Sequence, residues 1–140
     1  MSQTQHRAHC LCRAVALKAE GAPSRVGLCH CESCRRATGG VLMAAAGFPR
    51  GAVSVERGRM SYYASSPGVR RGFCAKCGTA LSYENERWPE DIHLMVGAFE
   101  RPALLKPQFH IFAQEQIPWL KLHDGLPRYH TTPSAGQLMD

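Results

Sequence analysis

The sequence predicts an all-β domain of short antiparallel strands with one short helix. Apolar and polar residues alternate in short runs, and glycine and proline separate most of these runs. The expected strands are residues 14–19, 43–48, 52–57, 60–63, 70–73, 80–83, 92–97 and 108–111. Only residues 32–38 have the pattern of a helix, which we expect to end at Gly39-Gly40.

The length of 140 residues predicts a single domain, residues 1–140. An apolar fraction of 44% and a charged fraction of 20% are typical of soluble globular proteins. Residues 1–9 are polar, and no run approaches the roughly 18 apolar residues that a membrane span needs. We therefore expect a cytoplasmic protein that does not bind membranes. The residues after Pro127 are polar, and we expect them to pack loosely.

All seven cysteines lie in three tight clusters, and this spacing predicts zinc binding. The clusters are Cys10-x-Cys12, Cys29-x-Cys31-x-x-Cys34 and Cys74-x-x-Cys77. Such spacings bring two thiolates to one ion from a single turn. The odd number of cysteines and the cytosolic setting argue against a disulfide framework. Four cysteines close a structural site, and the remaining three match a catalytic zinc with one open position.

Two groupings of the cysteines are physically reasonable. In the first, Cys10, Cys12, Cys74 and Cys77 form a structural four-sulfur site, and Cys29, Cys31 and Cys34 form the open site. In the second, Cys31 and Cys34 pair with Cys74 and Cys77 as in a zinc ribbon, which leaves Cys10, Cys12 and Cys29. We favour the first grouping, because the middle cluster can cover one face of an ion from a single loop and helix start. The second would require neighbouring cysteines to serve different metals.

His30 lies inside the middle cluster, where it is a candidate acid–base residue or a group that supports the metal ligands. In an extended segment, its side chain points away from those of Cys29 and Cys31. His110 and His123 are interpreted as polar residues near a core edge rather than as fourth ligands.

Paired arginines flank two of the cysteine clusters. Arg35 and Arg36 follow the middle cluster, and Arg70 and Arg71 precede the last. They are either solvated surface residues or a patch that binds an anionic ligand, and a guanidinium suits a carboxylate. The formal charge is +6, but seven thiolates and two zinc ions bring it to about +3. We therefore do not expect nucleic acid as a partner.

Three cysteine segments and a C-terminal pattern together indicate a known family. The segments are Cys10-Leu-Cys12-Arg-Ala-Val, Cys29-His-Cys31-Glu-Ser-Cys34-Arg-Arg-Ala-Thr-Gly39 and Phe73-Cys74-Ala-Lys-Cys77-Gly78-Thr79. His110-Ile111, Pro118-Trp119 and Asp124-Gly-Leu-Pro127 follow them. This arrangement resembles the glutathione-dependent formaldehyde-activating enzyme family over residues 7–129.

The resemblance implies a small all-β, Mss4-like zinc fold with two zinc ions. It implies the first grouping of cysteines, with the site of Cys29, Cys31 and Cys34 as the active one. It also implies a carbon–sulfur lyase that condenses glutathione with formaldehyde to S-hydroxymethylglutathione. Fold resemblance alone does not determine a substrate.

The ligand type of the open site favours the same chemistry. Three thiolates around Zn²⁺ give a net charge near −1 and a weaker Lewis acid than three histidines do, so hydrolysis is not favoured. A sulfur-rich site suits a fourth sulfur, such as that of glutathione. Arg35 and Arg36 are candidates to bind a glutathione carboxylate. The alternatives are a paralogue that acts on another small thiol, aldehyde or imine, and a non-catalytic zinc module.

Overall fold

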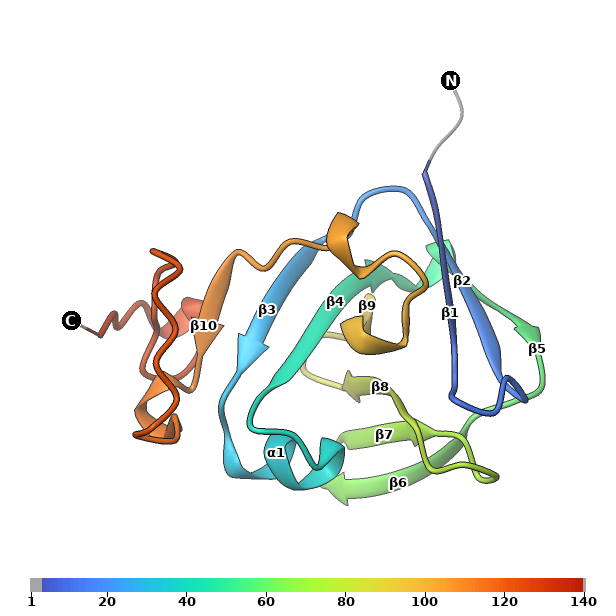
Figure 1. Cartoon of the computed structure of the whole chain (residues 1–140), viewed down its shortest axis with the longest axis horizontal. Helices are drawn as coiled ribbons and strands as arrows, with labels where there is room; N and C mark the ends of the chain where they lie inside the picture. The colour runs from blue at the N-terminus through green and yellow to red at the C-terminus, as the bar shows by residue number, and fades with distance from the viewer. Residues whose placement is uncertain (1–3, 140) are drawn as a thin grey trace.

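The computed structural model describes residues 4–139, which form two β-sheets around a shared core (Figure 1). The smaller sheet has the order β1-β2-β5 and consists of β1 (Gln5–His9), β2 (Ala16–Glu20) and β5 (Val53–Arg57). The larger sheet has the order β10-β3-β4-β9-β8-β7-β6. Its strands are β3 (Arg25–Cys29), β4 (Met43–Pro49), β6 (Ser61–Ser66), β7 (Val69–Phe73), β8 (Ala80–Asn85), β9 (Asp91–Met95) and β10 (Phe109–Ile111).

One α-helix lies within residues 4–139, α1 (Glu32–Thr38), at the bounds that the sequence predicts. It ends at Gly39, whose φ of 72° is the left-handed conformation of a typical C-cap glycine. Short 3-10 helices connect other elements: η1 (Arg50–Ala52), η2 (Val96–Ala98), η3 (Pro102–Leu104), η4 (Ala113–Glu115) and η5 (Pro133–Ala135). No helix among the described residues has both the length and the apolar content to cross a bilayer.

The predicted all-β class with one short helix near the middle cysteine cluster is confirmed. Two strands, β1 and β3, were not predicted from the sequence. The pairing also differs at one place: β10 runs parallel to β3, whereas the other paired strands are antiparallel.

Side chains of the larger sheet pack on both of its faces. Along β4, Met43 and Ala45 belong to one buried cluster, and Ala46 and Phe48 belong to another. Because successive strand residues point to opposite faces, these two clusters lie on opposite sides of the sheet. The main core also contains Leu17 and other residues of the smaller sheet. The second cluster contains the thiols of the middle cysteine segment.

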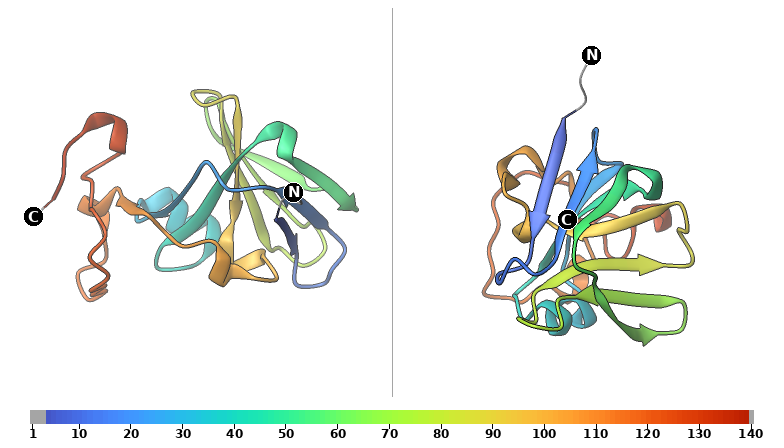
Figure 2. Two further views of the ribbon diagram at one scale, coloured as in Figure 1. Left: turned by 90° about the horizontal axis from the view of Figure 1, so that it is seen from above. Right: turned by 90° about the vertical axis from the view of Figure 1, so that its right-hand side faces the viewer.

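The C-terminal segment lies beside β10, at the end of the molecule away from β1, β2 and β5 (Figure 1 and Figure 2). Backbone N–H groups of His110 and Phe112 donate to the carbonyls of Pro127 and Thr131, over 2.9 and 2.8 Å. Tyr129 N–H donates to His110 O over 2.9 Å. We expected the polar residues after Pro127 to pack loosely. Instead, they are hydrogen-bonded to β10 and to the residue that follows it.

Candidate metal centre

The structure brings the seven thiols together in two separate groups. Within each group, the sulfur atoms lie within 4.8 Å of one another. One group comes from two segments and the other from a single segment. The groups are Cys10, Cys12, Cys74 and Cys77, and Cys29, Cys31 and Cys34. This grouping corresponds to the first of the two that the sequence allows.

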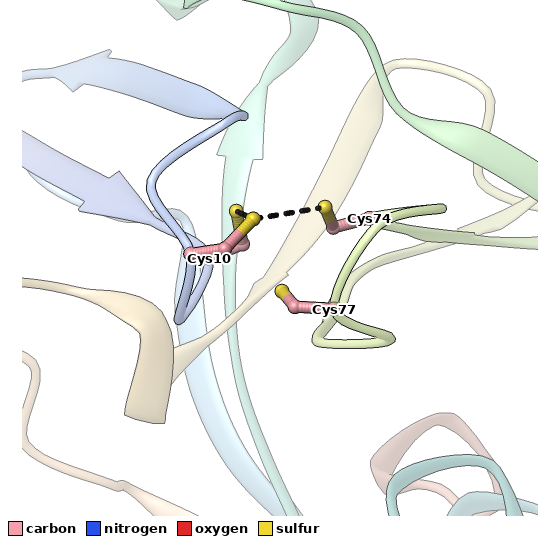
Figure 3. A group of neighbouring side chains, drawn as sticks. Cys10, Cys74 and Cys77 are labelled. Carbon is pink, nitrogen blue, oxygen red and sulfur yellow. Dashed lines mark hydrogen bonds between the residues drawn. The ribbon is translucent and has the colours of Figure 1, made fainter.

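The four-cysteine group joins the loop after β1 to the loop after β7 (Figure 3). Cys10 and Cys74 are buried in the main core, whereas Cys12 is exposed. The sulfur of Cys12 lies 3.7 Å from that of Cys10 and 3.7 Å from that of Cys74. Four sulfurs placed tetrahedrally at 2.3 Å from an ion are about 3.8 Å apart. The group therefore has the size of a closed zinc site.

Both loops of this group have the same kind of backbone turn. In each loop, the residue directly after the last cysteine adopts a left-handed conformation: Arg13 with φ 69° and Gly78 with φ 80°. Arg13 N–H donates to Cys10 O, and Gly78 N–H donates to Cys74 O. These tight turns aim both sulfurs of a loop in one direction. The hydroxyl of Thr79 lies 3.2 Å from the sulfur of Cys77 and lowers the pKa of that thiol to about 5.

The three-cysteine group lies where β3 ends and α1 begins. Cys29 is the last residue of β3, Cys31 is the N-cap of α1, and Cys34 is buried in its first turn. The backbone N–H of Cys34 donates to the sulfur of Cys31 over 3.3 Å. A sulfur that accepts a hydrogen bond at a helix start is stabilised as a thiolate.

The three thiols cannot all ionise easily without a cation among them. Hydrogen bonds from Cys29 and Cys34 lower the pKa of Cys31 to about 2. The hydrogen bond to Cys31 raises the pKa of Cys29, because a second thiolate beside the first is unfavourable. A divalent cation removes this penalty and allows all three thiols to ionise.

Arg71 approaches the three-cysteine group from β7, and sequence reasoning did not single it out from Arg70. Its two terminal nitrogens lie 3.8 and 3.9 Å from the sulfur of Cys34. Its Nε donates to Ser65 Oγ over 3.1 Å, and its guanidinium lies 5.0 Å from the ring centroid of Tyr83. Ser65 and Tyr83 thus fix a positive charge against one of the candidate ligands. Alternation along β7 sends Arg70 elsewhere, to Glu84 over 3.0 Å.

The two arginines predicted to bind substrate lie on α1. Arg35 is partly buried, and its Nε donates to the carbonyl of His30 over 3.2 Å. Arg36 is exposed and forms an ion pair with Glu32, one turn earlier, over 3.0 Å. Arg35 therefore holds the backbone of the cysteine loop, and Arg36 faces solvent.

His30, the predicted acid–base residue, is fully buried. Its Nε2 lies 2.8 Å from His110 Nδ1, and His110 Nε2 lies 2.8 Å from Asp124 Oδ2. Burial, followed by the neighbouring His110, lowers the pKa of His30 to about 4. Hydrogen bonds from Leu126 N–H and His110 lower the pKa of Asp124, although burial acts in the opposite direction. The sequence led us to interpret His110 as a polar residue near a core edge, whereas it is fully buried, and it placed Asp124 only in the family pattern.

A groove of about 780 Å³ runs between the surroundings of the two cysteine groups. Cys10 and Cys77 line one part of it. Met43 and Met95, which pack against the three-cysteine group, line another. Arg13 and Thr79 add polar groups to a mostly apolar lining.

The residues fit zinc as the resident metal. The donors are all thiols, which favour soft or borderline ions over magnesium or calcium, and their spacing fits a tetrahedral centre. The four-cysteine group would hold an ion whose four coordination positions are all filled by cysteine. The three-cysteine group would hold an ion with one position left for a further ligand.

Comparison with known proteins identifies the family of this chain. Residues 5–115 match the family model described as "Glutathione-dependent formaldehyde-activating enzyme". A Schizosaccharomyces pombe protein named "Uncharacterized lyase C29B12.13" is 37% identical over 87 residues, which cover 61% of this chain and 63% of that protein. The match thus spans less than two thirds of the relative's length. A crystal structure of a Rhodobacter sphaeroides protein shares the fold, with a TM-score of 0.57, 24% identity and coverage of 67% of this chain and 87% of that one. This chain belongs to the glutathione-dependent formaldehyde-activating enzyme family.

Proposed function

We propose that this protein is a zinc-dependent carbon–sulfur lyase that condenses glutathione with formaldehyde to S-hydroxymethylglutathione. One observation carries the proposal: three thiols converge from one loop and helix start, one fewer than a closed tetrahedral zinc site uses. Family membership and the lyase name of the Schizosaccharomyces pombe relative support it. We further propose that the protein acts in the cytoplasm, where a reducing environment keeps the thiols free.

The two cysteine groups have different roles in this proposal. Cys10, Cys12, Cys74 and Cys77 hold a structural zinc ion. Cys29, Cys31 and Cys34 hold the active one. When bound by three thiolates, zinc would keep a fourth sulfur deprotonated and still nucleophilic.

The charged residues around the active thiols favour an anionic substrate sulfur. Three thiolates on a divalent ion leave a net charge near −1, and a substrate thiolate makes the site more negative still. Arg71 lies 3.8 Å from the sulfur of Cys34 and offsets part of that charge. Because Ser65 and Tyr83 hold its guanidinium in place, no reorganisation is needed when the substrate arrives.

The reaction forms one bond and uses one proton. The sulfur of glutathione attacks the carbon of formaldehyde, the electron pair of the carbonyl π bond moves to oxygen, and that oxygen takes a proton. His30 is our candidate to take this proton from the thiol on the free lone pair of Nδ1 and to pass it to the oxygen, because its Nε2 already contacts His110. Arg35 and Arg36 are the candidates for a glutathione carboxylate, and the groove near Met43 accommodates the rest of the tripeptide.

The test is NMR exchange spectroscopy on zinc-replete protein with glutathione and formaldehyde. We expect faster formation and release of the adduct than in buffer, and we expect Cys31→Ser to abolish the acceleration. Arg59→Gln is the matched control, because Arg59 is exposed and lies outside the three cysteine segments. We expect it to keep full activity. If the protein with both zinc ions bound gives no acceleration, the formaldehyde reaction is excluded. Screening of other small thiols, aldehydes and imines with the same method then identifies a paralogue.

A further inference from the structure

A chain of hydrogen bonds links the three-cysteine loop to the C-terminal segment. It runs from His30, between Cys29 and Cys31, through His110 on β10 to Asp124. Both imidazoles are fully buried, and their ring centroids are 5.1 Å apart. Asp124 lies beyond residues 5–115, the segment that matches the family model.

The hydrogen bonds fix the direction of this chain. An ionised carboxylate only accepts, so His110 donates from Nε2 to Asp124 Oδ2. The other oxygen, Oδ1, accepts from the backbone N–H of Leu126 over 3.0 Å. Since His110 carries its proton on Nε2, its Nδ1 accepts, and the donor is Nε2–H of His30.

This direction leaves a free lone pair on His30 Nδ1. That atom is buried and has no hydrogen-bond partner among the described residues. A proton there would leave a buried N–H without an acceptor, which is costly. The geometry therefore favours the neutral Nε2–H tautomer of His30.

The backbone of His30 is held as well as its ring. Its N–H donates to Ile111 O over 3.1 Å, and its carbonyl accepts from Arg35 Nε over 3.2 Å. Parallel pairing of β3 with β10 places Cys29 opposite Ile111. β10 thus holds the loop that carries two of the three thiols.

We propose that Asp124 and His110 are positioning residues of the three-cysteine site. Asp124 accepts from His110, and His110 accepts from His30, so His30 is held as the Nε2–H tautomer. The backbone from Cys29 to Cys31 is then held in the conformation that brings the thiols together. Partners of this kind orient ligands and affect metal affinity, as supporting groups do in other metal sites. The inference rests on the proposed metal site and does not require formaldehyde as the substrate.

Asp124→Asn offers a sharp test, because it should reverse the chain. The amide oxygen must accept from Leu126 N–H, so the NH₂ group faces His110 and donates. His110 would then accept at Nε2, carry its proton on Nδ1 and donate to Nε2 of His30. The proton of His30 would move to Nδ1. An aspartate-to-asparagine change in a catalytic triad fixes the wrong histidine tautomer in the same way.

The experiment uses the zinc-replete protein with ¹⁵N-labelled histidine, and two-bond ¹H–¹⁵N couplings report each tautomer. We expect Nε2–H for His30 and His110 in the wild type and Nδ1–H for both in Asp124→Asn. Asp91→Asn, the same chemical change at a residue paired with Arg25, should leave both unchanged. Asp124→Ala, which removes both acceptors, should give mixed tautomers. A protonated Nδ1 of His30 in the wild type, or an Nε2–H form unchanged in both Asp124 variants, overturns the inference.

Zinc affinity, measured by competition with a chromophoric chelator, tests the positioning role. We expect about tenfold weaker binding at one of the two sites in Asp124→Asn and unchanged binding at the other. Equal affinities in variant and wild type would overturn the positioning role even with reversed tautomers. Because neither readout uses turnover, a protein with no thiol–aldehyde activity can still support this inference, and an active one can contradict it.

Discussion

The four-cysteine group and the three-cysteine group are built from the same ligand but are stabilised differently. The first has two tight turns whose backbones aim their sulfurs with hydrogen bonds inside each loop. The second draws all its thiols from one segment, and distant residues hold that segment in place. Arg71 comes from β7, and His110 and Asp124 come from the C-terminal region.

This difference shows how one fold can separate stability from chemistry. A group that fills its own tetrahedron, with Cys10 and Cys74 in the main core, can act as a crosslink between the loops after β1 and β7. A group that leaves a position free needs support from outside, because its ligands alone do not enclose the ion. The two groups also adjoin clusters on opposite faces of the larger sheet, so each can change with little effect on the other.

Breaking the four-cysteine group should have the largest effect. Cys74→Ser removes a buried ligand that joins two segments far apart in the chain. We expect a loss of stability on the order of 5 kcal/mol or more, comparable to the whole stability of a small domain. Circular dichroism during thermal or urea unfolding measures this loss. A Cys74→Ser protein that melts like the wild type would contradict a crosslinking role.

Breaking the three-cysteine group should affect chemistry and leave the fold. Cys31→Ser removes the N-cap sulfur and, with it, one bound zinc ion and the acceleration of adduct formation. We expect the melting temperature to fall by less than about 10 °C, because the main core is untouched. Elemental analysis counts the zinc, and the same melting curves report stability. Retention of two zinc ions would show that the assignment of ligands is wrong.

Removal of the Arg71 charge should have a smaller effect that is specific to the open site. In the cobalt-substituted protein, we expect Arg71→Gln to bind glutathione about tenfold more weakly, as seen in the sulfur-to-cobalt charge-transfer band. Arg71→Lys keeps the charge but loses the planar fork, so an intermediate affinity is expected. Arg59→Gln should match the wild type. Equal affinities across the series would remove Arg71 from the site's electrostatics.

The smallest expected effect concerns the acid sensitivity of the sheet face that carries the three cysteines. Burial, followed by the charge of Arg25, lowers the pKa of His93, which packs against Tyr83. Below pH 6.5, the unfolded chain therefore binds a proton that the folded chain does not, and stability falls with decreasing pH. We expect His93→Gln to lose less stability than the wild type between pH 7 and pH 5. Parallel stability curves for the two proteins would show that His93 does not contribute.

Much of the fold follows from local patterns in the sequence, and the missed strands show where such patterns fail. In β1, only His6 and Ala8 are buried, so the strand lacks the apolar alternation that marks the others. In β3, Gly27 interrupts the pattern, because the ring of Phe109 occupies the space where a side chain would be. β3 also depends on β10, a partner that is distant in the sequence, whereas β1 pairs with the next strand, β2.

The same distinction holds for the site. Cysteine spacing predicted the three clusters but allowed two ways to group them, and the structure has the grouping that we favoured. The link from His30 to His110 spans 80 positions, and nothing in either local sequence indicates it. Arg71 could be separated from Arg70 only by knowing which face of β7 meets Cys34. Residues that support the site from other strands are visible only once the topology is known.

The most direct test of two unequal sites is the time course of zinc release to an excess of chelator. In the wild type, we expect two phases of one zinc ion each, with the fast phase from the three-cysteine site. The fast phase should be absent in Cys31→Ser, whereas the slow phase keeps its rate. A single phase that releases both ions, or a loss of both phases in Cys31→Ser, would contradict a closed structural site beside an independent open one.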